Sequence, residues 1–218
     1  IEHPIITSFA PKVLHFEPIV FGGQYNSNEN DSALKFSIQT ASLEYDHNKI
    51  NTANLNIQST PQEVKLLVSI DSLNTAQATL LNTELKAILS NDSLNIDAIT
   101  KNETGNDRYA FGAIVSKNNQ AYTAHLKDRL ILNNQTWAIL PNNKIYYSPE
   151  GFYIRDFNLS TNMSILNIQS EQELVRSPID VEIKNFSITD ITSVLNKDTL
   201  LASGIINGNF KVTEFEKA

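Results

Sequence analysis

The stretch Ile179-Asp180-Val181-Glu182-Ile183-Lys184 decides the fold class. Three aliphatic residues alternate with three charged ones. A β-strand would therefore place the aliphatic side chains on one face of a sheet and the charged ones on the other. This alternation is typical of antiparallel sheets with one buried and one solvated face. The stretch predicts an all-β protein.

The same period-two pattern recurs along most of the chain. With 26 asparagines against 7 glycines, the turns between strands must be made mostly by Asn and Asp. We predict a long antiparallel meander of about a dozen strands. Its alternating stretches stand at 34–38, 54–58, 64–70, 109–115, 121–126, 130–132, 137–139, 144–147, 152–154, 179–184 and 209–212.

The apolar pattern changes parity at two places. It is even at Phe152 and odd at Phe157, and it slips again between Ile183 and Phe186. A slip of one residue turns the apolar side chains to the other face unless a β-bulge intervenes. We therefore expect bulges near 155–156 and 184–185, and a sheet that curls because bulges add bend and twist.

Helical signal is scarce. Thr189 could cap a short helix over 190–195, and the ambiguous stretch 80–89 favours a strand. Residues 1–33 are the least periodic, and we interpret them as an entry segment with a mobile loop. Residues 34–218 then form a single sheet domain with at most one or two short helices. A strand pattern that runs close to the last residue predicts that the chain is a fragment of a much longer protein.

Charge and motifs exclude several functions. The net charge of −7 and the pI of 5.1 argue against nucleic acid and against an anionic lipid surface as the main partner. Without cysteine there is no thiol nucleophile, disulfide or cysteine-ligated metal. The glycines form no phosphate loop, and the four histidines are scattered. We predict no catalytic residue, no metal and no cofactor, and hence no enzyme.

Two clusters have a functional interpretation that we regard as the weaker one. Asp180 and Glu182 share a face and could hold a cation or flank a glycosidic bond, but the solvated face of a strand explains them better. The aromatic residues at 146–147 and 152–153 could form a platform for carbohydrate. However, alternation puts Tyr146 and Tyr147 on opposite faces, which favours packing for one and exposure for the other. Trp137, the single tryptophan, is predicted to be buried against the apolar face.

The second half, over about 120–215, resembles the C-terminal region of the TamB (translocation and assembly module) family in its Bacteroidetes form. The resemblance rests on strand and turn patterns, not on chemically specific motifs. The matching stretches are the strand, polar turn and tryptophan of 130–139, the turn of 141–145, the short element of 152–160, the strand and short helix of 178–195, and the glycine-flanked strand start of 204–210.

The resemblance implies a fold and a role within the AsmA-like, bridge-like lipid transfer superfamily. Such proteins are anchored in the inner membrane, cross the periplasm and meet a BamA-like outer-membrane barrel. Their strands build a U-shaped apolar groove, the β-taco. The implied role is to conduct phospholipid acyl chains toward the outer membrane and to support outer-membrane protein assembly. This chain would be one periplasmic segment of that groove.

The residues agree with this role, because a single curled sheet with one apolar face must cover that face. Acyl tails would suit an open groove, whereas a second sheet would make a sandwich. We expect the groove to be lined by Ile179, Val181, Ile183, Phe210 and Val212. Two other classes stay open: a β-sandwich adhesin or glycan-binding module of an exported bacterial protein, and an enzyme with a site of scattered carboxylates.

Overall fold

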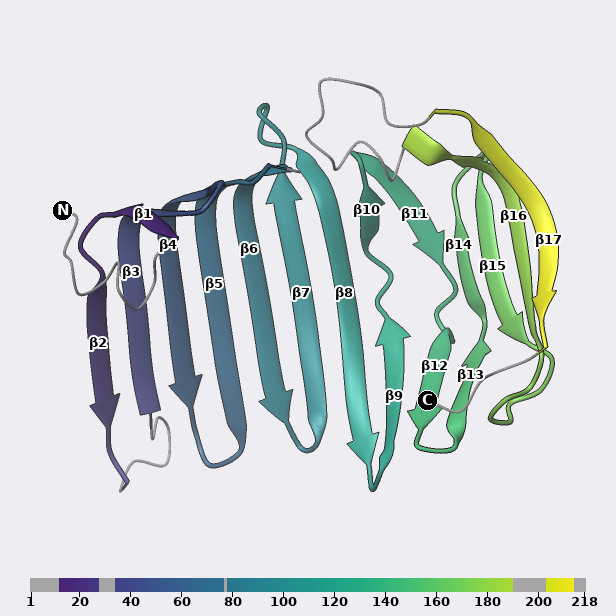
Figure 1. Ribbon diagram of the computed structural model, residues 1–218. Helices are drawn as coiled ribbons and strands as arrows, with labels where there is room; N and C mark the ends of the chain where they lie inside the picture. The colour runs from purple at the N-terminus through teal and green to yellow at the C-terminus, as the bar shows by residue number, and fades with distance from the viewer. Residues whose placement is uncertain (1–11, 28–33, 77, 190–202, 214–218) are drawn as a thin grey trace. The chain divides into compact units, whose positions relative to one another are not determined.

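The chain folds almost entirely into antiparallel β-structure (Figure 1). The computed structural model describes residues 12–27, 34–76, 78–189 and 203–213. Within these ranges there are seventeen strands, and only Ile188 and Thr189 are helical. No helix in this part of the chain has the length and apolarity to cross a membrane. The all-β prediction is thus confirmed, with more strands than the dozen expected.

The strands belong to two compact units, which we describe separately. The first unit contains β1 (Val13–Phe16), β2 (Val20–Tyr25), β3 (Leu34–Tyr45), β4 (Asn48–Ser59), β5 (Glu63–Asn74) and β6 (Thr79–Ser90). β7 (Ser93–Lys101) and the start of β8 (Asp107–Asn118) are shared between the two units. The second contains the rest of β8, β9 (Ala121–Leu126), β10 (Leu130–Leu132), β11 (Gln135–Ile139), β12 (Lys144–Ser148), β13 (Gly151–Arg155), β14 (Phe157–Ser160), β15 (Ile165–Ser170), β16 (Ile179–Ser187) and β17 (Ile205–Val212).

Asparagine and aspartate make the tight turns, as their abundance predicts. Of the eleven non-glycine residues described with a positive φ, nine are Asn or Asp. These side chains tolerate the left-handed conformation better than others, because they hydrogen-bond to nearby backbone. The hairpin of β3 and β4 turns at Asp46, and that of β10 and β11 turns at Asn133 and Asn134.

The first unit is a meander of long strands in constant register. β3, β4, β5 and β6 pair in sequence, while β1 and β2 lie end to end on the outer edge of β3. These two strands fall within 1–33, where the sequence pattern indicated an entry segment. The middle of β2 consists of Gly22 and Gly23, which give no apolar alternation. This explains why the strand was not recognised in the sequence.

A line of irregular residues crosses this meander. Each of its three ladders lacks one pair at the same level, and Thr52 and Asn82 have φ values of 44° and 43° there. On one side of the line the paired apolar row is Ile38, Leu55, Val68 and Leu85, and on the other it is Leu43, Ile50, Leu73 and Leu80. The parity of the hydrophobic pattern and the backbone therefore change together, as they must if one face is to stay apolar.

In the second unit three strand paths are each broken in two. β9 and β10 both pair with β8, and β12 pairs with β9 while β11 pairs with β10. β13 pairs with β12, and β14 pairs with β11. The third break lies at Asp156, which has a φ of 51°. The sequence predicted a β-bulge near 155–156, and the structure has a break between β13 and β14 at this place.

The second predicted bulge is confirmed. The register between β16 and β17 shifts between Ile183 and Phe186, and Asn185 has a φ of 48°. The shift lets Phe186 join the core in spite of its changed parity. The predicted strand over 80–89 corresponds to β6. The predicted helix over 190–195 lies outside the described residues. Of the polar stretch 24–32, which we interpreted as a loop, residues 24 and 25 belong to β2, and 28–32 also lie outside the described residues.

Candidate functional site

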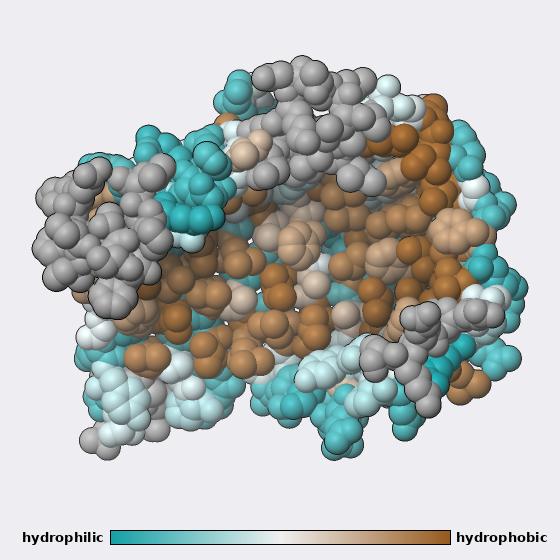
Figure 2. Space-filling model, viewed as in Figure 1, coloured by the Kyte–Doolittle hydropathy of each residue, from teal (hydrophilic) through white to brown (hydrophobic). Residues whose placement is uncertain are grey.

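The five residues predicted to line a groove lie on one face of the β14–β17 sheet. Ile179 pairs with Val212 and Val181 pairs with Phe210, while Ile183 stands opposite Gly208. The same rows continue across β15 and β14. Ile183 pairs with Leu166 of β15, which pairs with Leu159 of β14. Val181 pairs with Ile168 of β15, which pairs with Phe157 of β14. Figure 2 shows apolar side chains gathered over these strands. We call this surface the apolar face.

Exposure on the apolar face rises toward the edge strand. Ile179 is 4% and Val181 is 9% exposed, and Ile183 is half-buried. On β17, by contrast, Phe210 is 54% and Val212 is 37% exposed. Contact of these side chains with acyl chains stays a prediction. The gradient shows which of the five can be reached by a ligand without moving other side chains.

The opposite face of the same strands is charged. Asp180 stands opposite Lys211, whose ammonium lies 3.4 Å from the Asp180 carboxylate and also bonds Glu171. Both carboxylates raise the pKa of Lys211. Glu182 pairs with Lys184 on its own strand at 2.5 Å. These lysine partners favour the solvated-face interpretation of Asp180 and Glu182. In the described residues no group of three His, Asp or Glu side chains is placed to hold a metal ion.

A buried aromatic cluster bends the sheet toward the apolar face. Trp137 of β11 is fully buried, as predicted, with Leu130, Leu159 and Phe186 around it. β14 and β15 separate β11 from β16, so a flat sheet would hold those strands ~14 Å apart with side chains roughly perpendicular to it. The rings of Trp137 and Phe186 nevertheless lie 5.5 Å apart. Strand alternation predicted the burial of Trp137 but not its partner on β16.

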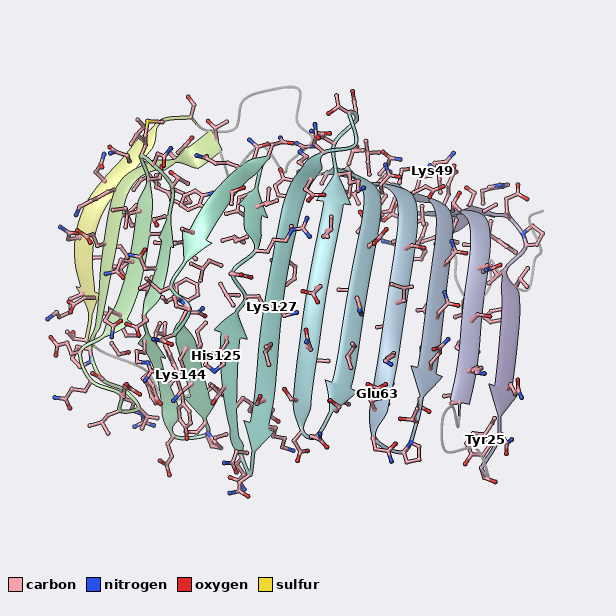
Figure 3. The ribbon with its side chains drawn as sticks, turned by 180° about the vertical axis from the view of Figure 1, so that it is seen from behind. Tyr25, Lys49, Glu63, His125, Lys127 and Lys144 are labelled. Atoms are coloured by element: carbon pink, nitrogen blue, oxygen red, sulfur yellow. The ribbon has the colours of Figure 1, made fainter. Side chains whose placement is uncertain are left out.

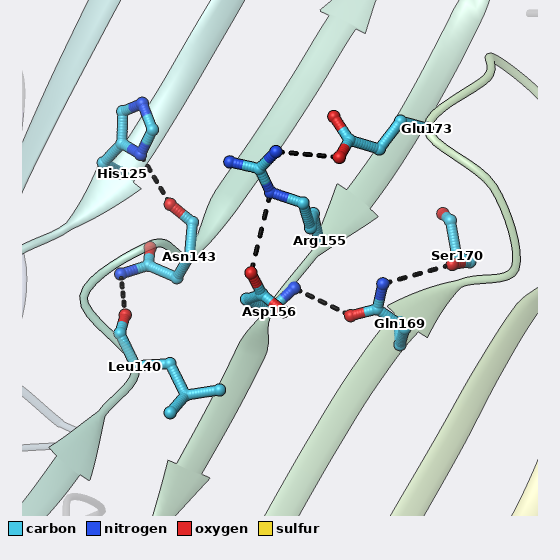
Figure 4. A network of polar contacts seen from close by, with 8 residues as sticks. All are labelled: His125, Leu140, Asn143, Arg155, Asp156, Gln169, Ser170 and Glu173. Atoms are coloured by element: carbon cyan, nitrogen blue, oxygen red, sulfur yellow. Dashed lines mark hydrogen bonds and ion pairs between the residues drawn. The ribbon is translucent and has the colours of Figure 1, made fainter.

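Asn143 fills the break between β11 and β12, and sequence reasoning missed it (Figure 4). Only 1% of it is exposed. Its side chain accepts from the Leu126 N–H and donates to the carbonyls of Leu126 and Leu140, at 2.7, 2.7 and 2.8 Å. His125 Nδ1 contacts the Asn143 carbonyl oxygen at 2.5 Å. Buried backbone groups without a hydrogen-bond partner are costly. The Asn143 side chain supplies partners to the backbone of Leu126 and Leu140, so the strand path can break without leaving these groups unpaired. In the sequence, the one signal for the role of Asn143 was its position two residues after Pro141, in a turn.

A second polar network supports the break at Asp156. The Gln169 side chain accepts from the Asp156 N–H at 2.7 Å, and the Ser170 hydroxyl accepts from the Ile154 N–H at 2.9 Å. Arg155 donates to Glu173 at 2.7 Å, and its Nε lies 3.6 Å from Asp156. Two neighbouring breaks in the sheet are thus held by side chains in place of ladder hydrogen bonds.

The Arg155–Glu173 pair gives a pH prediction. Its hydrogen bond lowers the pKa of Glu173 and raises that of Arg155. The pair therefore stabilises the fold above the unfolded-state pKa of glutamate, and this contribution is lost as the pH falls through the lowered pKa. We expect Glu173→Gln to lower the midpoint of urea unfolding slightly at neutral pH. The difference from the unsubstituted chain should vanish in acid, and a constant difference at all pH values would contradict this role.

The tyrosines lie as alternation predicts. Tyr146 of β12 stacks on Tyr153 of β13, with ring centroids 4.8 Å apart, and Tyr153 is buried. Tyr147 points to the other side and is 53% exposed. The carbohydrate platform that we regarded as the weaker interpretation does not form from all four rings, because Tyr146 and Tyr147 lie on opposite faces.

Comparison with protein-family models, with curated proteins and with solved structures finds no match to this chain.

Proposed function

We propose that this chain is a segment of a lipid-conducting groove in a TamB-like protein. The carrying observation is the apolar face of the β14–β17 sheet, which ends in exposed Phe210 and Val212 while the opposite face carries charged pairs. The first unit, taken by itself, supports the proposal with its rows of paired aliphatic residues. The resemblance over 120–215 supplies the family.

The physical argument concerns the transfer of acyl chains through water. Exposing a methylene to water costs ~0.8 kcal/mol, so a whole acyl chain costs ~10 kcal/mol or more. An apolar surface that offers similar side chains at successive positions lowers this barrier. Such a mechanism needs no acid, base or nucleophile. It needs strands in which apolar and polar side chains alternate regularly. It also needs a backbone irregularity wherever the parity of the apolar residues changes, so that the apolar side chains stay on one face.

The wider role follows from the resemblance and belongs to the proposal. The parent protein would be anchored in the inner membrane and span the periplasm, with this chain as one part of the span. Its phospholipid cargo would move toward the outer membrane, where a BamA-like barrel is the partner. Support of outer-membrane protein assembly would depend on the same path.

Site-specific photocrosslinking tests the proposal at Phe210. A benzoylphenylalanine there keeps an aromatic ring on the apolar face, at a position that is half exposed. We expect lipid adducts after irradiation of the chain with vesicles of phosphatidylethanolamine and phosphatidylglycerol. The matched control is Asn209, the neighbour that faces the other way beside Glu182. Equal adducts at both positions, or none at either, would contradict a lipid-conducting face.

A further inference from the structure

A polar cleft lies between two hairpin tips of the second unit. It has a volume of about 440 Å³ and lies where the turn of β8 and β9 approaches the turn of β12 and β13. That volume is within the ~300–1,000 Å³ range of small-molecule sites. The lining residues used below are Asn118, Gln120, Thr123, Lys144, Tyr146 and Glu150.

The cleft is lined from β12 by Lys144, Tyr146 and Ser148. Alternation along the strand puts these side chains on the face opposite to that of Ile145 and Tyr147. Tyr146 stands opposite Thr123 of β9 and Tyr153 of β13, and the register places these three side chains on one face. Figure 3 shows Lys144 in the view from behind, opposite to that of Figure 2. The cleft is therefore separate from the apolar face, and a ligand bound there would not compete with acyl chains.

Several polar side chains of the cleft make no hydrogen bond to other described residues, although the Ser148 hydroxyl donates to the Gly151 carbonyl and accepts from the Glu150 N–H. Within the described part of the chain, Asn118, Gln120 and Glu150 make no side-chain hydrogen bond, and neither do Thr123 and the Tyr146 hydroxyl. Their amide, hydroxyl and carboxylate groups offer both donors and acceptors. The turn between β7 and β8 uses such groups differently: Asn102 accepts from the N–H groups of Thr104 and Asn106, which closes its own turn.

One wall of the cleft is aromatic and fixed. The Tyr146 ring is held by the stacked Tyr153 at an interplanar angle of 16°. The Lys144 ammonium lies 6.0 Å from the Tyr146 centroid and 5.2 Å from that of Tyr153, so a cation–π interaction occupies it. The lining also includes the carboxylate of Glu150, so positive charge does not dominate as an anion site would require.

We propose that this cleft binds a neutral saccharide. Sugar hydroxyls are simultaneously donors and acceptors, which matches unpartnered amides beside a carboxylate and a hydroxyl. The apolar face of a pyranose ring matches the flat surface of Tyr146. The site goes beyond lipid conduction, because it lies on another surface and uses different residues.

The experiment follows backbone amide signals by NMR in the full 218-residue chain. The probes are neutral trisaccharides of glucose, mannose, galactose and N-acetylglucosamine, each at ~10 mM so that weak binding is detected. We expect at least one of them to shift the amides of residues 118–121, Ser148 and Glu150. Gln120→Ala with Glu150→Ala should weaken that binding about tenfold or more.

Two controls keep the proposal falsifiable. Gln135→Ala with Thr136→Ala removes a matched pair of exposed polar side chains from β11 and should leave binding unchanged. Inorganic phosphate at the same concentration should not shift these amides. If no trisaccharide shifts them, or if phosphate shifts them as strongly, the saccharide site is refuted. Neither result bears on the crosslinking at Phe210.

Discussion

Replacing Trp137 with alanine is expected to lower the free energy of unfolding by about 3–5 kcal/mol. Trp137 is fully buried between β10, β14 and β16, and its ring meets Phe186 at 5.5 Å. Truncation removes this contact and leaves a cavity at the point where the sheet bends. Urea unfolding followed by far-UV circular dichroism measures the loss, since the variant contains no tryptophan to report it.

Tyr147→Ala is the matched control for this prediction. It removes another aromatic side chain from the same unit, but one that is 53% exposed. Its cost should stay below ~1 kcal/mol. A Trp137→Ala variant that unfolds at the same urea concentration as the Tyr147→Ala variant would mean that the aromatic cluster does not hold the bend.

The parts of the fold that the sequence predicts are those with strict alternation. β16 was legible from 179–184, because each charged residue there is exposed or paired while each aliphatic one faces the sheet's apolar side. Turn positions were legible because Asn and Asp were abundant and glycine was scarce. The parity change before Phe186 predicted a bulge for a physical reason: a regular strand would have exposed that ring.

Other features left no signal of comparable strength. Thr52 is β-branched, and its positive φ contradicts its ordinary preference. The line of irregular residues becomes visible only when the parity of several strands is compared in register. Asn143 was one of many asparagines, and its two hydrogen bonds to Leu126 depend on β9 lying beside β12. Burial that results from pairing distant segments cannot be inferred from a local pattern.

The structure also changes which substitution best tests the lipid groove. From alternation alone, Val181→Asp would insert a charge among passing acyl chains while the fold survives in an open trough. Val181 is only 9% exposed, however, and lies between Ile168 and Phe210. A carboxylate there would be costly to bury even without lipid. Unfolding and loss of lipid binding would then be indistinguishable.

Phe210→Asp separates the two effects, and we expect it to weaken phospholipid binding at least tenfold. The position is 54% exposed on an edge strand, so the free protein can hydrate the new carboxylate. Acyl chains on the apolar face would have to strip that water, and an unpaired buried charge costs well over the ~1.4 kcal/mol that corresponds to tenfold. Fluorescence titration with NBD-labelled phosphatidylethanolamine measures the change.

Asn209→Asp provides the decisive comparison, because it adds the same charge one residue away on the opposite face. Asn209 stands across from Glu182 and beside Lys211, in a row where charges are already solvated. It should bind the labelled lipid as the unsubstituted chain does, and both variants should keep the same far-UV circular dichroism spectrum. If Phe210→Asp and Asn209→Asp weaken binding equally, net charge governs the association. If neither weakens it, the lipid does not touch the apolar face, and conduction along these strands must be abandoned.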